Sequence, residues 1–297
     1  MSKFIAYVEC LRPGQWTKNL VVLAAVIFSR NMFVPDMALR SLAALGIFCL
    51  LAGSVYVFND LADIKRDRLH PEKSKRPIAS GRVSRTGAFT LGCSAAVVGL
   101  ALAWALGTSF LLVAGIYFVL ITGYSMGLKN VVVLDVMIIS IGFILRAIAG
   151  VEALKPLDPG VVISPWLLVC TLFLALFLGF NKRRHELGLL AEGAGDHRRS
   201  LMEYSKEFLD AMIAVVTAST VIAYSIYTIW PATVEKFDTT NLIYTVPFVV
   251  FGLFRYMYLV IMKNRGGNPS EVLISDLPIL ADIAVWIVVV ALVLYTS

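Results

Sequence analysis

Long apolar stretches that carry few or no charges dominate this sequence of 297 residues. Each has about 18 to 23 residues, enough for an α-helix to cross a hydrocarbon layer about 30 Å thick. The composition agrees, because 59% of the residues are hydrophobic and only 15% are charged, against roughly 45–50% and about 25% in soluble domains. The sequence therefore excludes a soluble globular enzyme and predicts an all-α, polytopic membrane protein.

Apolar runs bounded by charged residues or by Gly and Pro clusters predict nine membrane-spanning helices in one integral membrane domain over residues 1–297. The expected helices cover residues 18–35, 37–58, 87–106, 108–127, 131–151, 161–180, 207–230, 240–262 and 278–296. Two long polar loops, at about 59–86 and 181–206, follow the second and sixth helices. Since both follow an even-numbered span, we expect them on the same side of the membrane as the N-terminus.

The distribution of Lys and Arg predicts the orientation. Of the 26 basic residues, 20 fall on the side of the N-terminus and the two polar loops, and four on the other side. Because basic loops stay in the cytoplasm, we expect a multi-pass protein of a bacterial-type cytoplasmic membrane with its N-terminus and polar loops inside. The net charge of +6 is then a topology signal, and no nucleic acid partner is expected.

Four oxygen-bearing side chains lie at helical spacing where the second expected span ends. These side chains belong to Asn59, Asp60, Asp63 and Asp67, which fall within an arc of about 100° on an α-helix. Carboxylates one turn apart repel each other unless a cation joins them. Mg²⁺ fits, because proteins hold it through one or two carboxylates together with water and substrate phosphates. The alternative is a polar helix end that only stops the span.

The loop that follows carries Lys73, Lys75 and Arg76 between prolines and a glycine. Such a loop can close over anions, and its position beside the acidic residues favours that function. The alternative is the basic flank that follows many membrane spans on the cytoplasmic side.

These motifs resemble the UbiA-type superfamily of intramembrane prenyltransferases over nearly the whole chain. The matching residues are Asn59-Asp60-x-x-Asp63-x-x-x-Asp67, Arg76-Pro77-Ile78-Ala79-Ser80-Gly81, Arg12-Pro13-x-x-Trp16-x-Lys18-Asn19 and Tyr124-Ser125-x-x-Leu128-Lys129. The resemblance implies a nine-helix bundle with a cytoplasmic polar cap, Mg²⁺ on the aspartate motif, and a lateral opening for a polyprenyl chain.

The chain departs from the superfamily members that prenylate aromatic acceptors. Those members carry a second aspartate motif after the sixth helix, where this chain has Lys182, Arg183 and Glu186. Basic residues in place of a carboxylate pair indicate a ligand with additional negative charge. The chain is similar here to the decaprenyl-phosphate phosphoribosyltransferase branch, in which 5-phosphoribose moves from phosphoribosyl diphosphate (PRPP) to a polyprenyl phosphate. In that branch the product supplies arabinofuranose donors for the cell envelope.

The resemblance gives each candidate residue a role. Asp60, Asp63 and Asp67 are expected to act in catalysis through Mg²⁺, with Asn59 as a further ligand. The residues expected to bind substrate phosphates are Lys18, Lys73, Lys75, Arg76, Tyr124, Lys129, Lys182, Arg183 and Glu186. Less certain candidates are Asp135, Arg146, Arg198 and Tyr204.

Several alternatives stay open from the sequence. Arg146 lies inside an apolar span, where it either touches substrate or pairs within the bundle. Arg255 either snorkels or pairs in the same way. The competing functions are transfer of a prenyl group to an aromatic or other small acceptor, and membrane transport.

Overall fold

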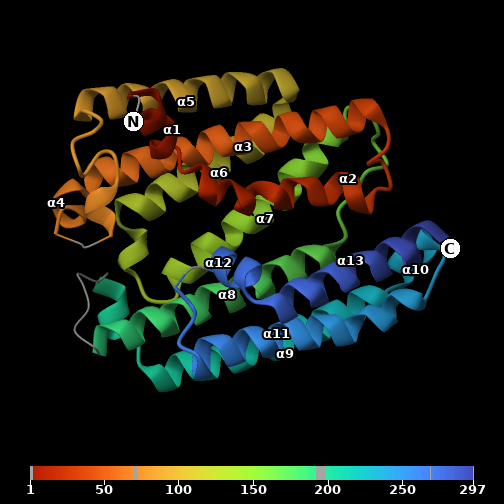
Figure 1. The fold of residues 1–297 in the computed structure, drawn as a ribbon. Coiled ribbons are helices and arrows are strands. Elements are labelled where there is room, and N and C mark those ends of the chain that lie inside the picture. Colours follow the sequence, from red (N-terminus) through yellow and green to blue (C-terminus); the bar gives the residue numbers. More distant parts are fainter. Residues whose placement is uncertain (1–2, 70–71, 192–198, 268, 297) are drawn as a thin grey trace. The chain divides into compact units, whose positions relative to one another are not determined.

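The computed structural model describes residues 3–69, 72–191, 199–267 and 269–296. In these ranges the chain forms α-helices and short 3₁₀-helices and no β-strand (Figure 1), which confirms the all-α expectation. The helices form two compact units, with α1 to α7 and Ser200 in the first and α8 to α13 in the second. Each unit is described by itself.

The first unit is built around the long, largely buried helix α3. Its elements are α1 (Lys3–Cys10), η1 (Pro13–Leu23), α2 (Ala24–Phe28), α3 (Pro35–Ala62), α4 (Ile64–Asp67), η2 (Lys73–Lys75), α5 (Arg85–Leu106), α6 (Thr108–Met126), η3 (Leu128–Asn130) and α7 (Leu134–Leu154). Helices α5, α6 and α7 all pack on α3. In the core, the Phe48 ring lies 6.0 Å from the Phe110 ring and 5.0 Å from the Tyr117 ring. These aromatic contacts join α3 to α6.

The second unit pairs α8 with α9 and α11 with α13. Its elements are α8 (Pro165–Ala191), α9 (Lys206–Ile229), α10 (Pro231–Phe237), η5 (Asn241–Thr245), α11 (Val246–Met262), α12 (Pro269–Ser275) and α13 (Leu277–Thr296), and η4 (Arg199–Glu203) precedes α9 in the chain. Trp286 of α13 donates a hydrogen bond to the hydroxyl of Tyr224 on α9 at 3.1 Å. Polar links of this kind fix the register of helices whose remaining contacts are apolar.

Eight helices in the described ranges are long and apolar enough to cross a membrane. They are Pro35–Ala62, Arg85–Leu106, Thr108–Met126, Leu134–Leu154, Pro165–Leu189, Lys206–Ile229, Asn241–Met262 and Leu277–Leu294. They correspond to the second to ninth expected spans. The chain is thus a multi-pass membrane protein.

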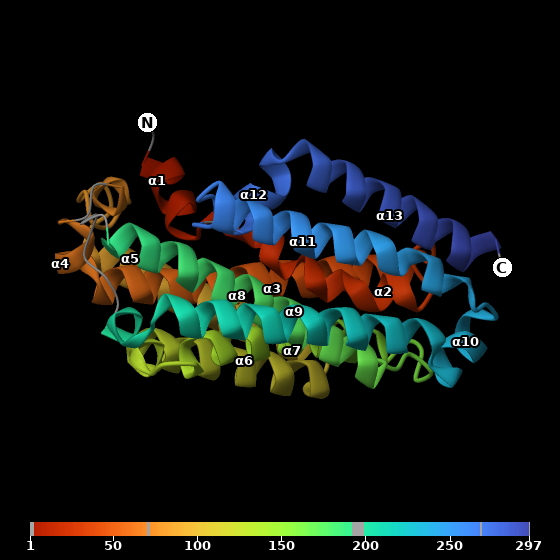
Figure 2. The same ribbon diagram turned by 90° about the horizontal axis from the view of Figure 1, so that it is seen from below.

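The first expected span has a different form. In place of a regular helix over residues 18–35, an eleven-residue 3₁₀-helix, η1, leads into the five-residue α2. A 3₁₀-helix rises about 2.0 Å per residue, so η1 and α2 together extend about 30 Å. Figure 2 shows this segment running along α3, from α1 near α4 to α2 near the opposite end of α3. The prediction of a regular helix was wrong, because Arg12, with φ 52°, and Pro13 start η1 before the apolar run begins.

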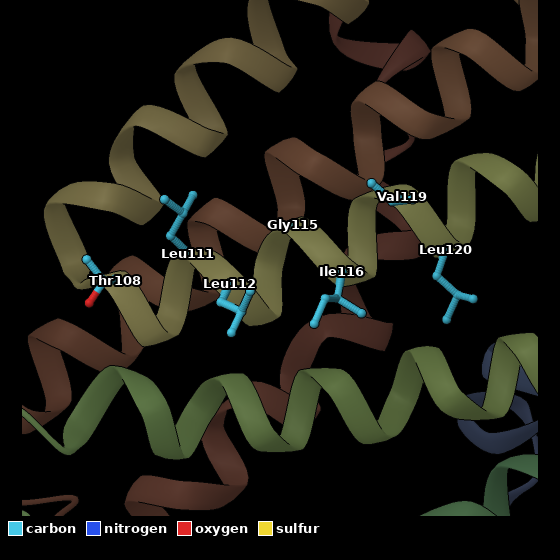
Figure 3. Close-up of a pocket in the computed structure, with 7 residues that line it drawn as sticks. All are labelled: Thr108, Leu111, Leu112, Gly115, Ile116, Val119 and Leu120. Atoms are coloured by element: carbon cyan, nitrogen blue, oxygen red, sulfur yellow. The ribbon is translucent and has the colours of Figure 1, made fainter.

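The first unit has a polar contact at one end of α3 and an apolar groove along α6. At the end of α3 opposite α4, the Arg40 guanidinium donates to the carbonyls of Leu106 and Ala153, near the C-termini of α5 and α7. The groove along α6 in Figure 3 is largely apolar, and Leu112, Ile116 and Leu120 project from the helix there. A lining of this composition suits contact with hydrocarbon.

Candidate active site

The acidic residues lie around a break between α3 and α4. Helix α3 ends at Ala62, and Asp63 at the break has a φ of −95° and a ψ of 9°. Backbone hydrogen bonds continue through the break, from the Asp63 N–H to the Asn59 carbonyl at 3.0 Å and from the Asp67 N–H to the Asp63 carbonyl at 2.9 Å. The helical hydrogen-bond pattern expected over residues 59–67 therefore continues, although the dihedral angles of Asp63 depart from those of a helix.

Asp60 and Asp67 form the first of two pairs. Both are buried, with 3% and 4% of their surface exposed. The Arg76 Nη1 atom lies 3.2 Å from the Asp60 Oδ1 atom and 2.8 Å from the Asp67 Oδ2 atom. Arg12 also donates to Asp60. Two arginines therefore compensate two carboxylates that burial would otherwise disfavour.

Asn59 and Asp63 form the second pair, around Lys129. The Lys129 Nζ atom lies 3.3 Å from the Asn59 Oδ1 atom and 3.0 Å from the Asp63 Oδ2 atom. Lys129 is buried in η3, and its carbonyl accepts a hydrogen bond from the Ser200 hydroxyl at 2.9 Å. This side chain thus reaches the aspartate motif from the loop between α6 and α7.

The four side chains do not converge on one point. Among the residues that the structure describes, no three His, Cys, Asp or Glu side chains are placed to share a metal ion. Nevertheless, each pair offers hard oxygen donors directed at one positively charged nitrogen. Mg²⁺ needs only one or two carboxylates, with water and phosphate oxygens completing its shell. The donors therefore fit a divalent cation that takes over the charge of Arg76 or Lys129.

Arg12 contacts the aspartate motif, although the sequence analysis assigned it no role. It adopts a left-handed backbone with φ 52°, which is uncommon for a residue other than Gly, Asn or Asp. Its guanidinium bonds Asp60 and lies 4.8 Å from the centre of the Tyr56 ring. The sequence already pointed to Arg12, because this residue opens the motif at residues 12–19 that resembles the family.

The loop between α4 and α5 is fixed by its own contacts. The Arg68 Nε atom donates to the Ala79 carbonyl at 3.1 Å, and Arg82 forms an ion pair with Glu9 of α1 at 2.7 Å. Lys75 pairs with Glu72 at 2.9 Å, where both side chains are exposed. The loop thus presents Arg76 to the carboxylates and places Lys75 at the surface.

The other predicted phosphate-binding residues of this unit lie in separate elements. Lys18 belongs to η1, Lys73 to η2, and the buried Tyr124 to the last turn of α6. Asp135 is fully buried in the first turn of α7. Their roles stay predictions.

Arg146 pairs inside the first unit. Its guanidinium donates to Asn19 of η1 at 2.7 Å, to the Tyr117 hydroxyl of α6 at 2.7 Å and to the Gly142 carbonyl at 2.9 Å. It also stacks on the Tyr117 ring at 4.6 Å. Of the two interpretations left open by the sequence, this geometry favours the structural one, because these contacts join η1, α6 and α7.

The basic residues of the second unit lie within a helix and not in a loop. Residues 181–191 of the loop expected over 181–206 belong to α8, which ends at Ala191, so that part of the expectation was wrong. Lys182 and the buried Arg183 share Glu186, with the Lys182 Nζ atom 3.8 Å from its Oε1 atom. The expectation that Lys182 and Glu186 share a helix face is confirmed. Arg184 instead binds Asp210 of α9 at 2.5 Å.

The remaining candidates differ in what the structure says of them. Tyr204 is buried, and its ring lies 6.0 Å from that of Phe208. Arg198 lies outside the described residues. Arg255 binds Asp276 through its Nε and Nη2 atoms, at 3.1 and 2.9 Å, so it pairs structurally.

A nucleophilic cysteine beside the aspartates is ruled out by its protonation. Cys10 is buried in α1, and burial, followed by the nearby charge of Asp60, raises the pKa of its thiol to about 11. The thiol stays protonated at neutral pH and is a poor nucleophile. Cys10 is therefore no candidate for the attacking group at neutral pH.

Comparison with known proteins identifies the family of the chain. The model of the UbiA prenyltransferase family matches residues 19–274. The chain is 31% identical over 299 residues to a decaprenyl-phosphate phosphoribosyltransferase of Mycolicibacterium smegmatis, with 98% of this chain and 92% of the relative covered. It is also 31% identical over 301 residues to the enzyme of that name from Corynebacterium glutamicum, covering 97% and 86%.

Solved structures show the same fold. A UbiA homologue from Archaeoglobus fulgidus, bound to GPP and Mg²⁺, superposes with a TM-score of 0.71 at 19% identity. The match covers 97% of this chain and 99% of the homologue. At this identity the likeness supports the fold alone.

Proposed function

Because the chain belongs to the UbiA prenyltransferase family, we propose that it transfers 5-phosphoribose from PRPP to a decaprenyl-like polyprenyl phosphate. Two relatives named for this activity match it over nearly their whole length. The observation that carries the proposal is the basic turn of α8, where Lys182 and Arg183 share a single carboxylate. A donor with phosphates at both ends of its sugar calls for such cations.

The reaction forms a bond between a lipid phosphate oxygen and C1 of the ribose and breaks the bond between C1 and the diphosphate. The lipid phosphate is already an anion at neutral pH, so no base has to remove a proton. This agrees with a site whose described groups are carboxylates, an amide and cations. The residues position the reactants and stabilise the departing diphosphate.

Magnesium is part of the proposal. When bound, it offsets the charge that develops on the leaving diphosphate. Asp60 with Asp67, and Asn59 with Asp63, are the pairs that would hold it. Arg76 and Lys129, released from these carboxylates, bind phosphate oxygens, and Lys18, Lys73, Lys75 and Tyr124 contribute to phosphate binding.

The distribution of basic residues supports a proposal for the membrane and the orientation of the protein. We assign the protein to the cytoplasmic membrane, with the N-terminus and the aspartate motif inside, because 20 of its 26 Lys and Arg fall on that side. PRPP is then available from the cytoplasm. The lipid product would supply arabinofuranose donors for the envelope.

The test is a product assay. The detergent-purified protein receives labelled PRPP, polyprenyl phosphate and Mg²⁺, and a parallel reaction contains a prenyl diphosphate and 4-hydroxybenzoate. We expect labelled lipid that requires Mg²⁺. A prenylated aromatic product, with all label left in water, would instead establish the prenyltransferase alternative, and uptake of unchanged substrate into liposomes would establish transport.

A further inference from the structure

The loop that follows α11, residues 263–267, has a fixed backbone. Helix α11 ends at Met262, and Asn264 then adopts a left-handed φ of 52°. The N–H of Arg265 donates to the Leu259 carbonyl at 3.0 Å. A left-handed residue with a hydrogen bond reaching back over the last turn is a common helix stop, and Asn tolerates it better than most residues. The loop therefore leaves α11 in a defined direction.

Two glycines place this loop directly on the basic turn of α8. A Cβ atom on Gly266 would lie 2.8 Å from the Cβ atom of His185 and 3.1 Å from a methyl group of Val260. A Cβ atom on Gly267 would lie 3.2 Å from the Nε2 atom of His185. Since only glycine allows such an approach, the loop and the helix turn pack as one surface.

This surface carries more positive than negative charge. Lys263 and Arg265 are exposed, and neither forms an ion pair with a described carboxylate. Asp276, whose pKa is lowered chiefly by its hydrogen bonds from Arg255 and in part by the charge of Arg265, already accepts from Arg255 and from the N–H of Ile279. Among the described residues, the guanidinium N–H groups of Arg265 therefore form no hydrogen bond to Asp276 and can donate to another group.

The α8 side of this surface also carries more positive than negative charge. Lys182 and Arg183 form ion pairs with the same residue, Glu186, and Arg184 forms one with Asp210. Glu207 at the start of α9 is exposed and pairs with none of these cations among the described ion pairs. An excess of Lys and Arg on a fixed backbone is suited to a phosphate group, which accepts several charge-assisted hydrogen bonds at once.

We propose that Lys263 and Arg265 form, with the basic turn of α8, a binding site for a substrate phosphate group. This inference rests on the proposed function, which supplies two phosphorylated substrates. The phosphate belongs either to the water-soluble sugar donor or to the polyprenyl phosphate. The sequence analysis assigned neither residue a role, because Lys263 and Arg265 resemble the ordinary basic flank of a span.

The test measures the two substrates separately. The double variant Lys263→Gln/Arg265→Gln is compared with wild type in neutral phosphatidylcholine vesicles, with PRPP and polyprenyl phosphate varied in turn. Loss of charge-assisted hydrogen bonds should raise KM for one substrate about tenfold, with kcat within about twofold. The substrate whose KM rises identifies the source of the phosphate. Lys3→Gln/Arg85→Gln removes the same charge from exposed positions of the first unit and should leave both constants unchanged.

A second variant tests the packing without changing any charge. Gly266→Ala forces the loop away from the rigid Cβ atom of His185 and should raise the same KM. Gly46→Ala, at a position with open space around it, is the matched control. If both KM values stay at wild type in the charge variant or in Gly266→Ala, the loop is only a topological flank.

Failure of this inference is separable from failure of the proposed function. A wild-type protein that transfers phosphoribose, with variants that match it, overturns the phosphate site alone. A wild-type protein without transfer overturns the proposed function. In that case calorimetric titration with inorganic diphosphate decides, because the site predicts about tenfold weaker binding in the double variant, and equal binding would overturn it.

Discussion

The Nζ atom of Lys129 lies 3.0 Å from the Oδ2 atom of Asp63, although 66 positions separate the two residues in the chain. The contact joins η3 to the break at the end of α3. Because Lys129 is buried, its ammonium group depends on Asp63 and Asn59 rather than on water for compensation. Asp63 thus positions a buried cation, and in the proposed function it would also offer an oxygen to Mg²⁺.

Replacing Asp63 by Ala should abolish turnover while the protein remains folded and inserted. We expect a loss of roughly 100- to 1000-fold or more in kcat, the scale found when one stabilising group is removed from a transition state. Transfer of labelled phosphoribose to lipid measures it. Asp36→Ala, at an exposed position in the first turn of α3, is the control. Wild-type activity of Asp63→Ala at saturating Mg²⁺ would remove this residue from the metal site.

Replacing Arg76 by Gln should separate metal affinity from turnover. Arg76 competes with a divalent cation for Asp60 and Asp67, so its removal should lower the half-saturating Mg²⁺ concentration by roughly three- to tenfold. At the same time kcat should fall, because a phosphate ligand is lost. A Mg²⁺ titration of activity gives both numbers. A higher half-saturating concentration would show that Arg76 supports the metal and does not compete with it.

Reversing the charge of Lys182 should damage donor binding. Lys182→Asp puts two carboxylates one turn apart on α8, beside Arg183, and we expect KM for PRPP to rise by more than about tenfold. KM for polyprenyl phosphate should change far less. Lys3→Asp, at an exposed position in α1, serves as the matched reversal. An unchanged KM for PRPP would mean that the basic residues of α8 only set the orientation of the protein in the membrane.

Removing Arg146 should destabilise the first unit. Arg146→Met leaves the Asn19 side chain and the Tyr117 hydroxyl buried without their donor, at a cost of about 3 kcal/mol. In a protein of this size the thermal midpoint should fall by roughly 5 to 10 °C. Unfolding in detergent measures the shift, with Arg85→Met as the exposed control. A midpoint equal to that of wild type would show that these hydrogen bonds add nothing.

Acid should weaken the attachment of α12 and α13 to α11. The hydrogen bonds from Arg255 hold the pKa of Asp276 below its ordinary value of 3.8. A carboxyl group with a depressed pKa in the folded state stabilises the fold above its ordinary pKa, and this stability is lost as pH falls through the folded value. Wild type should therefore exceed Asp276→Asn in thermal midpoint near pH 6, and the difference should shrink as the pH falls below 3.8 toward the depressed pKa of the folded state. A constant difference across this range would contradict the assignment.

The hydropathy of the sequence was sufficient to predict most of the membrane-spanning helices. The second to ninth expected spans all correspond to helices, because a long apolar run has few ways to satisfy its backbone in a membrane. It could not give the form of the first span, since a 3₁₀-helix and an α-helix share the same composition. Nor could it show that α8 continues to Ala191, because a helix that leaves the apolar layer becomes polar without ending.

Spacing was sufficient for the acidic residues but not for their partners. Asn59, Asp60, Asp63 and Asp67 were found from their period along a helix, which is a local property. Their cations come from Arg12, Arg76 and Lys129, and only the folded chain shows which carboxylate each one meets. The two pairs, Asn59 with Asp63 and Asp60 with Asp67, are already neighbours on a regular helical wheel, so what the spacing lacks is the cation that each pair meets.

The three carboxylates of the aspartate motif have three basic partners within the chain. In the proposed reaction, loading the site would therefore be an exchange. A diphosphate that brings its own Mg²⁺ would let the carboxylates pass from arginine and lysine to the metal while the basic groups pass to phosphate. The total charge around the aspartate motif would change little in this double exchange, and free Mg²⁺ without a phosphate ligand would gain far less from entering.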